Sequence, residues 1–456
     1  MPIKVKKSDG TTPTEKLLTA LCERSFLKLW SYPNPFKEDG DELCDLLVVY
    51  GDHAFVFFDR EKDLDFSSDK APEVIWKRWV RTVIDAQIRT TKGAERYLKS
   101  DRPIYLDSKR ANPFPLEMSR RSLIVHKFIV AHGAKEACKA SSDKNVTGSL
   151  AISYGAHSSP ADFPYFIHLD KSDPVHVFDS ENLPIVLSEL DTIADFLSYI
   201  EEKERAIHKY QWLMYCGEED LLAHYLLNFD DTSKRHIIGS EKEQFDGVYI
   251  GEGEWVDFIG SDTFKNTKKA NEISYIWDEL LQITSQNALD GTLTGNAKLL
   301  QGRSAIFEMA KEPRFSRRAL CEYMTMVIHK FPEPKGSGIM RHVAFMPSFY
   351  PNRGYVYLQF HAPELRADRD YRSKRAFLLE IACGAAKIKF PEMQTIIGIG
   401  MDAPKYAEEN EEDFILLNCS DWTEEQEAHY AALNAELKFF QTGQHSETKR
   451  HVTEFV

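Results

Sequence analysis

The amino-acid sequence predicts a mixed α/β protein with an N-terminal domain built on an extended sheet and a separate α/β domain at its C-terminal end. Residues 42–62, ELCDLLVVYGDHAFVFFDREK, contain two apolar runs separated by Gly51-Asp52, the pattern of an antiparallel hairpin. A long amphipathic pattern at 73–99 precedes a strongly apolar segment at 121–132, which predicts a helix returning the chain to the same sheet. Strand and helix patterns alternate again after residue 340, so the last third predicts its own layered domain.

The hairpin is preceded by a helix with a clear start signal. Thr12-Pro13-Thr14-Glu15 has the form of a capping box with proline at the first helical position. The helix is expected to run to about Trp30. Its apolar residues recur at helical spacing: Leu17, Leu18, Leu21, Cys22, Phe26 and Leu29.

After the long helix the sequence predicts an extended sheet. Further strands are expected at 148–154, 163–169 and 175–178, followed by a helix at 185–207. Histidines are frequent here, but their spacings match no metal-ligand pattern: His126, His132, His157, His168 and His176.

Three regions follow from these patterns. We expect an N-terminal domain over residues 1–210, a mostly helical connecting region over 211–335, and a C-terminal α/β domain over 336–456. In the last region a hairpin is expected over 342–361, helices at 371–390 and 424–440, and strands at 395–401 and 414–419.

Composition restricts the classes of function. With 57 Lys and Arg against 71 Asp and Glu, the net charge of −14 excludes a general affinity for nucleic acid, so any such binding must be focal. The seven cysteines form no C-x-x-C pair and read as reduced core residues rather than a zinc site. No apolar run approaches the roughly 20 residues of a membrane span, and the N-terminus lacks a signal-peptide core. A cytoplasmic protein with no membrane partner is expected.

The only charged residue inside the first strand of the hairpin is Asp45, and burying it costs several kcal/mol unless it has a partner. Residues 12–130 resemble the PD-(D/E)XK nuclease superfamily in the layout of their charged residues. That layout has an acid on a preceding helix, an Asp at the start of one strand, and an acid-x-Lys at the end of the next strand. The resemblance implies a restriction-endonuclease-like N-terminal domain. It also implies Mg²⁺ or Mn²⁺ held by acids, and a lysine that activates water.

Carried onto this sequence, the resemblance implies that Asp45, Asp59 and Glu61 are the metal ligands. Glu23 takes the place of the helical acid, although a solvated Glu paired with a basic residue one turn away is an equal alternative. The basic group is Arg60, Lys62 or a helix lysine such as Lys77.

Two registers of the hairpin are open. With Gly51-Asp52 at the centre of the turn, Asp45 faces Phe58 and shares its side of the sheet with Arg60 and Lys62. A bulge near the turn would instead pair Asp45 with Asp59 and bring Glu61 to that face. Because a buried Asp facing Phe58 would lack compensation, we expect the bulged register.

The long helix supplies a candidate surface for phosphates. One side is apolar, and the other carries a basic stripe: Arg78, Arg81, Arg89, Lys92 and Arg96. A solvated basic face is the equal alternative. Gln87 projects from the apolar side, similar to a helix Gln behind the metal site of some nucleases in this superfamily.

Two functions are therefore expected. The first is a metal-dependent nuclease that cleaves phosphodiester bonds, with defence against foreign DNA suggested by analogy of fold. The second is a catalytically degenerate nuclease-like module that binds nucleic acid or a protein partner. The C-terminal domain is expected to mediate a protein contact or self-association.

Overall fold

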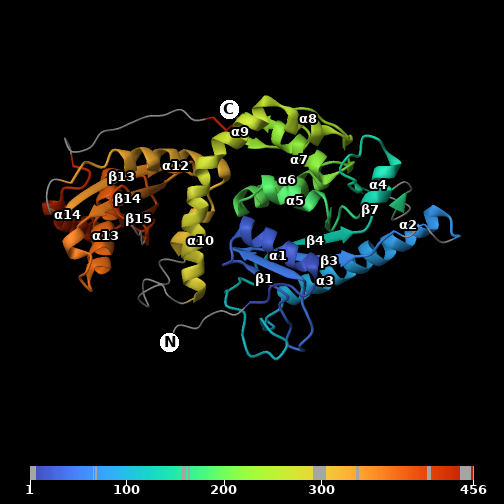
Figure 1. Ribbon diagram of the computed structural model, residues 1–456, viewed down its shortest axis with the longest axis horizontal. Coiled ribbons are helices and arrows are strands. Elements are labelled where there is room, and N and C mark those ends of the chain that lie inside the picture. Colours follow the sequence, from blue (N-terminus) through green and yellow to red (C-terminus); the bar gives the residue numbers. More distant parts are fainter. Residues whose placement is uncertain are drawn as a thin grey trace. The chain divides into compact units, whose positions relative to one another are not determined.

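A computed structural model describes residues 7–64, 66, 69–155, 161–162, 165–290, 304–334, 338–407, 412–441 and 453–454 (Figure 1). The chain is a mixed α/β protein that divides into two compact units. We call residues 4–265 the N-terminal unit and residues 266–456 the C-terminal unit.

The main sheet of the N-terminal unit has the order β1-β2-β3-β4-β8. Its strands are β1 (Ser31–Pro33), β2 (Leu46–Tyr50), β3 (His53–Glu61), β4 (Ile124–His132) and β8 (His176–Asp179). The first three are antiparallel, and β4 and β8 run parallel to β3. The predicted hairpin and the predicted strand after the long helix are both present.

Helices cover both faces of this sheet. On one face α1 (Pro13–Phe26) and α6 (Ile193–Lys209) bring aromatic side chains together with those of the strands: Phe26, Phe55, Phe128 and Phe196. On the other face α3 (Ala86–Leu98) packs on β2 and β3 through a cluster that includes Leu47, Val49, Val56, Phe58, Tyr97 and Leu98. The sheet is therefore the middle of three layers, and its two faces are separate environments.

The predicted capping box of α1 is confirmed. The Thr12 hydroxyl accepts from the Glu15 amide, and the Glu15 carboxylate accepts from the Thr12 amide. All seven cysteines are free and buried.

The long helix predicted at 73–99 contains a π-helical turn. It consists of α2 (Pro72–Val80), a π segment η1 (Arg81–Asp85) and α3. A π turn adds about one residue to the turn, so the helical positions after it are rotated relative to a regular α-helix. The apolar residues Val83 and Ile84 of this turn are fully buried.

A second sheet extends the N-terminal unit in the order β12-β9-β5-β7-β6. The strands are β5 (Ala151–Tyr154), β6 (Ala161–Asp162), β7 (Phe166–Leu169), β9 (Trp212–Tyr215) and β12 (Gly247–Ile250). Because β9 pairs with both β5 and β12, residues that we expected in a connecting region complete this sheet. The boundary predicted after residue 210 therefore falls inside the N-terminal unit.

The remaining elements of this unit are short. The helix predicted at 185–207 is two helices, α5 (Asn182–Glu189) and α6, because the buried Thr192 caps a new helix by accepting from the Asp195 amide. The others are α4 (Lys135–Ser141), α7 (Glu218–Leu227), β10 (Phe229–Asp230), β11 (Arg235–His236) and α8 (Glu254–Gly260). Helix α9 (Asp262–Asn271) leads into the C-terminal unit.

The C-terminal unit contains a four-stranded sheet in the order β13-β14-β15-β16. Its strands are β13 (Met340–Pro347), β14 (Arg353–His361), β15 (Thr395–Asp402) and β16 (Asp413–Asn418). The helices are η2 (Glu272–Ser274), α10 (Tyr275–Asp290), residues 304–310, α12 (Arg314–His329), η3 (Pro363–Leu365), α13 (Tyr371–Lys389) and α14 (Glu424–Leu437). The hairpin, strands and two helices predicted after residue 340 are confirmed.

Among the helices that the structure describes, none combines the length and apolar character needed to cross a bilayer.

Candidate functional site

The hairpin of β2 and β3 has the direct register. Tyr50 pairs with His53 and Leu46 with Phe57, with no extra residue on either strand. Gly51 adopts a positive φ of 59° in the two-residue turn, a conformation that glycine allows without strain. Continued by one pair, this ladder aligns Asp45 with Phe58. The bulged register, which would bring Asp45 and Asp59 to one face, is wrong.

Asp45 nevertheless has a partner. Its Oδ2 accepts a hydrogen bond from the Asp59 amide at 2.5 Å. Burial raises the pKa of Asp45 to about 7, against the lowering effect of that hydrogen bond, and the charges of Glu42 and Glu15 add to the increase. The carboxyl is therefore mostly protonated below neutral pH, which lowers the cost of its burial there.

The Asp59 carboxylate lies on the opposite face of the sheet, because successive side chains of a strand alternate. Its Oδ1 is 2.6 Å from His132 Nε2. Glu61 is exposed and pairs in register with His132. The proposed metal ligands Asp45, Asp59 and Glu61 are thus divided between two faces, and the sequence expectation that they form one metal group is not met.

The acid that helix α1 presents to Asp45 is Glu15 rather than Glu23. Glu15 Oε2 and Glu42 Oε1 both accept from the Asn34 side-chain amide, and both charges act on Asp45. Burial raises the pKa of Glu23, whereas the charges of Lys7 and Lys28 lower it. Sequence reasoning missed Glu15 because it assigned that residue to the helix cap, which it also forms.

Arg60 occupies the same face of β3 as Phe58 and is held by helix α3. With the Gln87 amide oriented so that its oxygen faces Arg60, the guanidinium Nε and Nη2 donate to it at 2.6 and 3.0 Å. Gln87 is buried and lies two residues after the end of the π turn. Lys62 is directed elsewhere, since its Nζ donates to the Thr82 hydroxyl at 3.1 Å. Lys77 is exposed on α2.

Four of the five predicted stripe residues are exposed: Arg78, Arg81, Arg89 and Arg96. Lys92 differs, because its Nζ forms an ion pair with Asp173 at 2.8 Å. Asp85 lies between Arg81 and Arg89; burial raises its pKa, and these two arginines lower it. We call the four exposed residues the arginine stripe.

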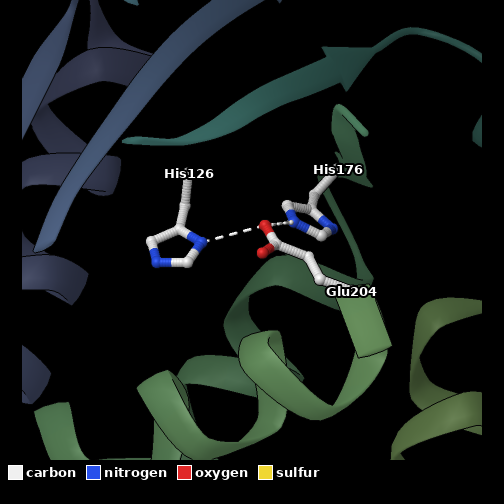
Figure 2. A group of neighbouring side chains, drawn as sticks. All are labelled: His126, His176 and Glu204. Atoms are coloured by element: carbon white, nitrogen blue, oxygen red, sulfur yellow. Dashed lines mark hydrogen bonds and ion pairs between the residues drawn. The ribbon is translucent and has the colours of Figure 1, made fainter. Parts of the chain in front are cut away.

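A histidine–glutamate group lies on the other face of the sheet, and sequence reasoning missed it. Figure 2 shows Glu204 reaching between the rings of His126 and His176. In the described part of the chain these residues are the one group of three His, Cys, Asp or Glu side chains whose ligand atoms all lie within 4.8 Å of one another. They come from β4, β8 and α6, so no linear spacing could reveal them. His157 lies outside the described residues.

Comparisons of the chain with protein-family models, with curated proteins and with solved structures return no match.

Proposed function

We propose that the N-terminal unit is a nucleic-acid-binding module with a nuclease-like arrangement that does not hydrolyse phosphodiester bonds. The observation that carries the proposal is the direct register of the hairpin, which places Phe58 and Arg60, and no second strand acid, beside Asp45.

The order of elements supports the nuclease-like arrangement. Helix α1 precedes three antiparallel strands, and α2, η1 and α3 then lead to β4, which runs parallel to β3. Asp45 directly precedes β2, and Gln87 of α3 contacts Arg60 of β3. This is the sequence of elements that a resemblance to the PD-(D/E)XK superfamily implies for residues 12–130.

The donor set of this face does not fit Mg²⁺ or Mn²⁺. Such ions take several oxygen ligands, and they are usually held by one or two carboxylates together with substrate phosphates. Here Phe58 stands where an acid is required, and the neighbouring Arg60 is too basic to accept a proton from water. Asp45 is engaged by the Asp59 amide, and the nearby Glu15 and Glu42 both accept from the Asn34 amide. Among the described residues these acids do not form a group of three with ligand atoms within 4.8 Å of one another. We therefore derive no metal-assisted cleavage step.

Arginine is well suited to the remaining task, which is to bind phosphate. Its planar guanidinium donates in a fork that matches phosphate oxygens. Arg60 is exposed yet oriented by the buried Gln87, and the arginine stripe adds four further cations along the helix behind it. Because the whole chain carries a net charge of −14, such a surface would act locally rather than through a general attraction.

Fluorescence anisotropy with short labelled single- and double-stranded DNA and RNA tests the proposal. Wild-type protein should bind at low salt, and Arg81→Ala/Arg89→Ala should weaken binding by at least about tenfold, since each phosphate contact contributes to affinity. The control Lys16→Ala/Lys242→Ala removes the same charge at exposed positions outside the stripe. Equal loss in both double mutants would assign binding to net charge alone, and no binding by the wild type to any of these probes would overturn the proposal.

A further inference from the structure

The buried histidine–glutamate group on the α6 face is built from three separate elements. His126 and His176 are about 1% and 0% exposed and lie on the neighbouring parallel strands β4 and β8. Glu204 extends from α6, with about 26% of its side chain exposed, so one side of the group opens toward solvent. This group is independent of the Asp45 face, because the sheet separates the two.

A single carboxylate oxygen joins the two rings. Glu204 Oε1 is 2.9 Å from His126 Nδ1 and 3.0 Å from His176 Nε2 (Figure 2). In the metal-free state each of these ring nitrogens donates its proton to Glu204 Oε1. A nitrogen that loses this proton has a lone pair directed toward the same carboxylate oxygen, where a metal ion could bind. Two imidazole nitrogens and a carboxylate are typical ligands of zinc and related transition metals, with the fourth position left for water.

We propose that His126, His176 and Glu204 bind a divalent transition-metal ion of the zinc class. The ion would replace the two ring protons that His126 and His176 donate to Glu204. It would thereby crosslink β4, β8 and α6. Hard ions such as Mg²⁺ are disfavoured, because they prefer oxygen ligands over imidazole.

The surroundings of His126 support this assignment. Its second nitrogen, Nε2, is 3.0 Å from His53 Nδ1, and the two rings stack with an interplanar angle of 6°. His53 Nε2 in turn lies 3.8 Å from a carboxylate oxygen of Glu201. Histidine ligands commonly donate their other N–H to a group that fixes the ring orientation. Once Nδ1 holds the metal, Nε2 carries the proton and donates to His53.

The second ring is also open to the exchange of a proton for a metal. His176 Nδ1 is buried and has no hydrogen-bond partner among the described residues. In the metal-free state the Glu204 carboxylate holds the ring proton on Nε2, and metal binding at Nε2 would move that proton to Nδ1. The competing account is a metal-free cluster in which Glu204 accepts from both rings, and it predicts a different response to added metal.

The test is metal content and stability of the full chain. Protein dialysed against chelator and then titrated with Zn²⁺ should bind one ion per chain tightly and unfold at a higher temperature, because a ligand that binds only the folded state stabilises it. Co²⁺ in the same site should give visible ligand-field absorption. His126→Ala, His176→Ala and Glu204→Gln should each abolish this binding, and His53→Phe should weaken it by about 10- to 100-fold.

His132→Ala is the matched control. His132 lies on the same strand and also pairs with a carboxylate, that of Asp59, but belongs to no three-residue group in the described chain. This variant should bind Zn²⁺ as the wild type does. If the alanine variants of His126 and His176 unfold, Glu204→Gln still decides, since it keeps an oxygen acceptor at a partly exposed position. Equal metal binding by Glu204→Gln and wild type, or no stoichiometric binding by the wild type, would overturn the proposal.

Discussion

Asp45 and Asp59 are joined by a hydrogen bond, yet their carboxylates lie on opposite faces of the sheet. The Asp59 amide donates to Asp45 Oδ2, while Asp59 Oδ1 is bonded to His132. A backbone donor therefore partly offsets the burial of the carboxyl for which the sequence predicts a metal ion. The two acids act as separate structural groups, each on its own side of β3.

This arrangement makes stability depend on pH through Asp45. Burial raises the pKa of Asp45 from 3.8 to about 7 in the folded state. An acid whose folded pKa is raised contributes its full stability below the unfolded pKa and loses it as pH rises through the folded pKa. The loss should therefore extend from about pH 4 to above pH 7.

Asp45→Asn should remove that loss. The amide oxygen can still accept from the Asp59 N–H, so at pH 8 the variant should be more stable than wild type by about 4 kcal/mol, at one pKa unit per 1.36 kcal/mol. At pH 4 the two proteins should be nearly equal. Urea denaturation at both pH values measures this, with Glu61→Gln as an exposed control in the same hairpin. A variant less stable than wild type at pH 8 would contradict the assignment.

His132 adds a second pH dependence. Burial lowers the pKa of His132, but the hydrogen bond and charge of Asp59 outweigh it, and the pKa is raised. A histidine with a raised pKa stabilises the fold below its unfolded pKa, and this contribution is lost as pH rises through the folded pKa. Nuclear magnetic resonance titration should find the His132 ring above the ordinary histidine value in wild type and at a lower pKa in Asp59→Asn. An unchanged pKa in that variant would exclude the ion pair.

The interior of the N-terminal unit contains one ion pair that should be sensitive to the loss of either partner. Lys203 Nζ contacts both carboxylate oxygens of Glu218 at 2.6 Å, and both side chains are fully buried. The Tyr199 hydroxyl donates to the same carboxylate at 2.7 Å. Lys203→Met leaves Glu218 without its cation and should cost about 3–5 kcal/mol.

A double-mutant cycle isolates this pair. Adding Glu218→Gln to Lys203→Met should recover much of the loss, because the amide needs no countercharge and still accepts from Tyr199. Chemical denaturation of the four proteins gives the coupling. Additive effects of the two substitutions would show that the pair does not behave as one buried unit.

The arginine stripe predicts a change in salt dependence as well as in affinity. If Arg81 and Arg89 each contact one phosphate, the slope of log K against log salt concentration should become less steep by about 2 in Arg81→Ala/Arg89→Ala. Binding isotherms at several salt concentrations measure the slope. Weaker binding with an unchanged slope would mean that the two side chains act through the fold rather than through phosphate.

The sequence was informative where local signals agree with the fold. The capping box of α1, the Gly51-Asp52 hairpin and the strand–helix alternation after residue 340 all rest on residues close in the chain. The residue types alone do not decide the register of the β2–β3 hairpin, because the two alternatives differ by a shift of one residue. The hydrogen-bond donor to Asp45 is a backbone amide, which every residue except proline has, so the sequence does not reveal it. The expected bulge rests on the premise that a buried acid requires a second side chain as its partner, whereas a backbone amide fills that role.

Other features depend on tertiary contacts that no local pattern contains. No local sequence pattern predicts the π turn at Arg81–Asp85. This turn precedes Gln87, the residue that contacts Arg60. Strands β9 and β12, which follow the boundary expected after residue 210, complete a sheet that begins at β5, and their pairing is not visible in the local sequence. His126, His176 and Glu204 meet only because β4 and β8 are neighbours and α6 covers them.

The most direct test of the central claim is a combined binding and cleavage experiment on wild-type protein. Labelled single- and double-stranded DNA and RNA are incubated with excess protein and Mg²⁺ or Mn²⁺. Fluorescence anisotropy measures the bound fraction of the nucleic acid, and denaturing electrophoresis measures its length. The direct register predicts that the nucleic acid is bound but remains full length. Metal-dependent cleavage by the wild type that is lost in Asp45→Asn would contradict this account and restore Asp45 as the centre of an active nuclease site.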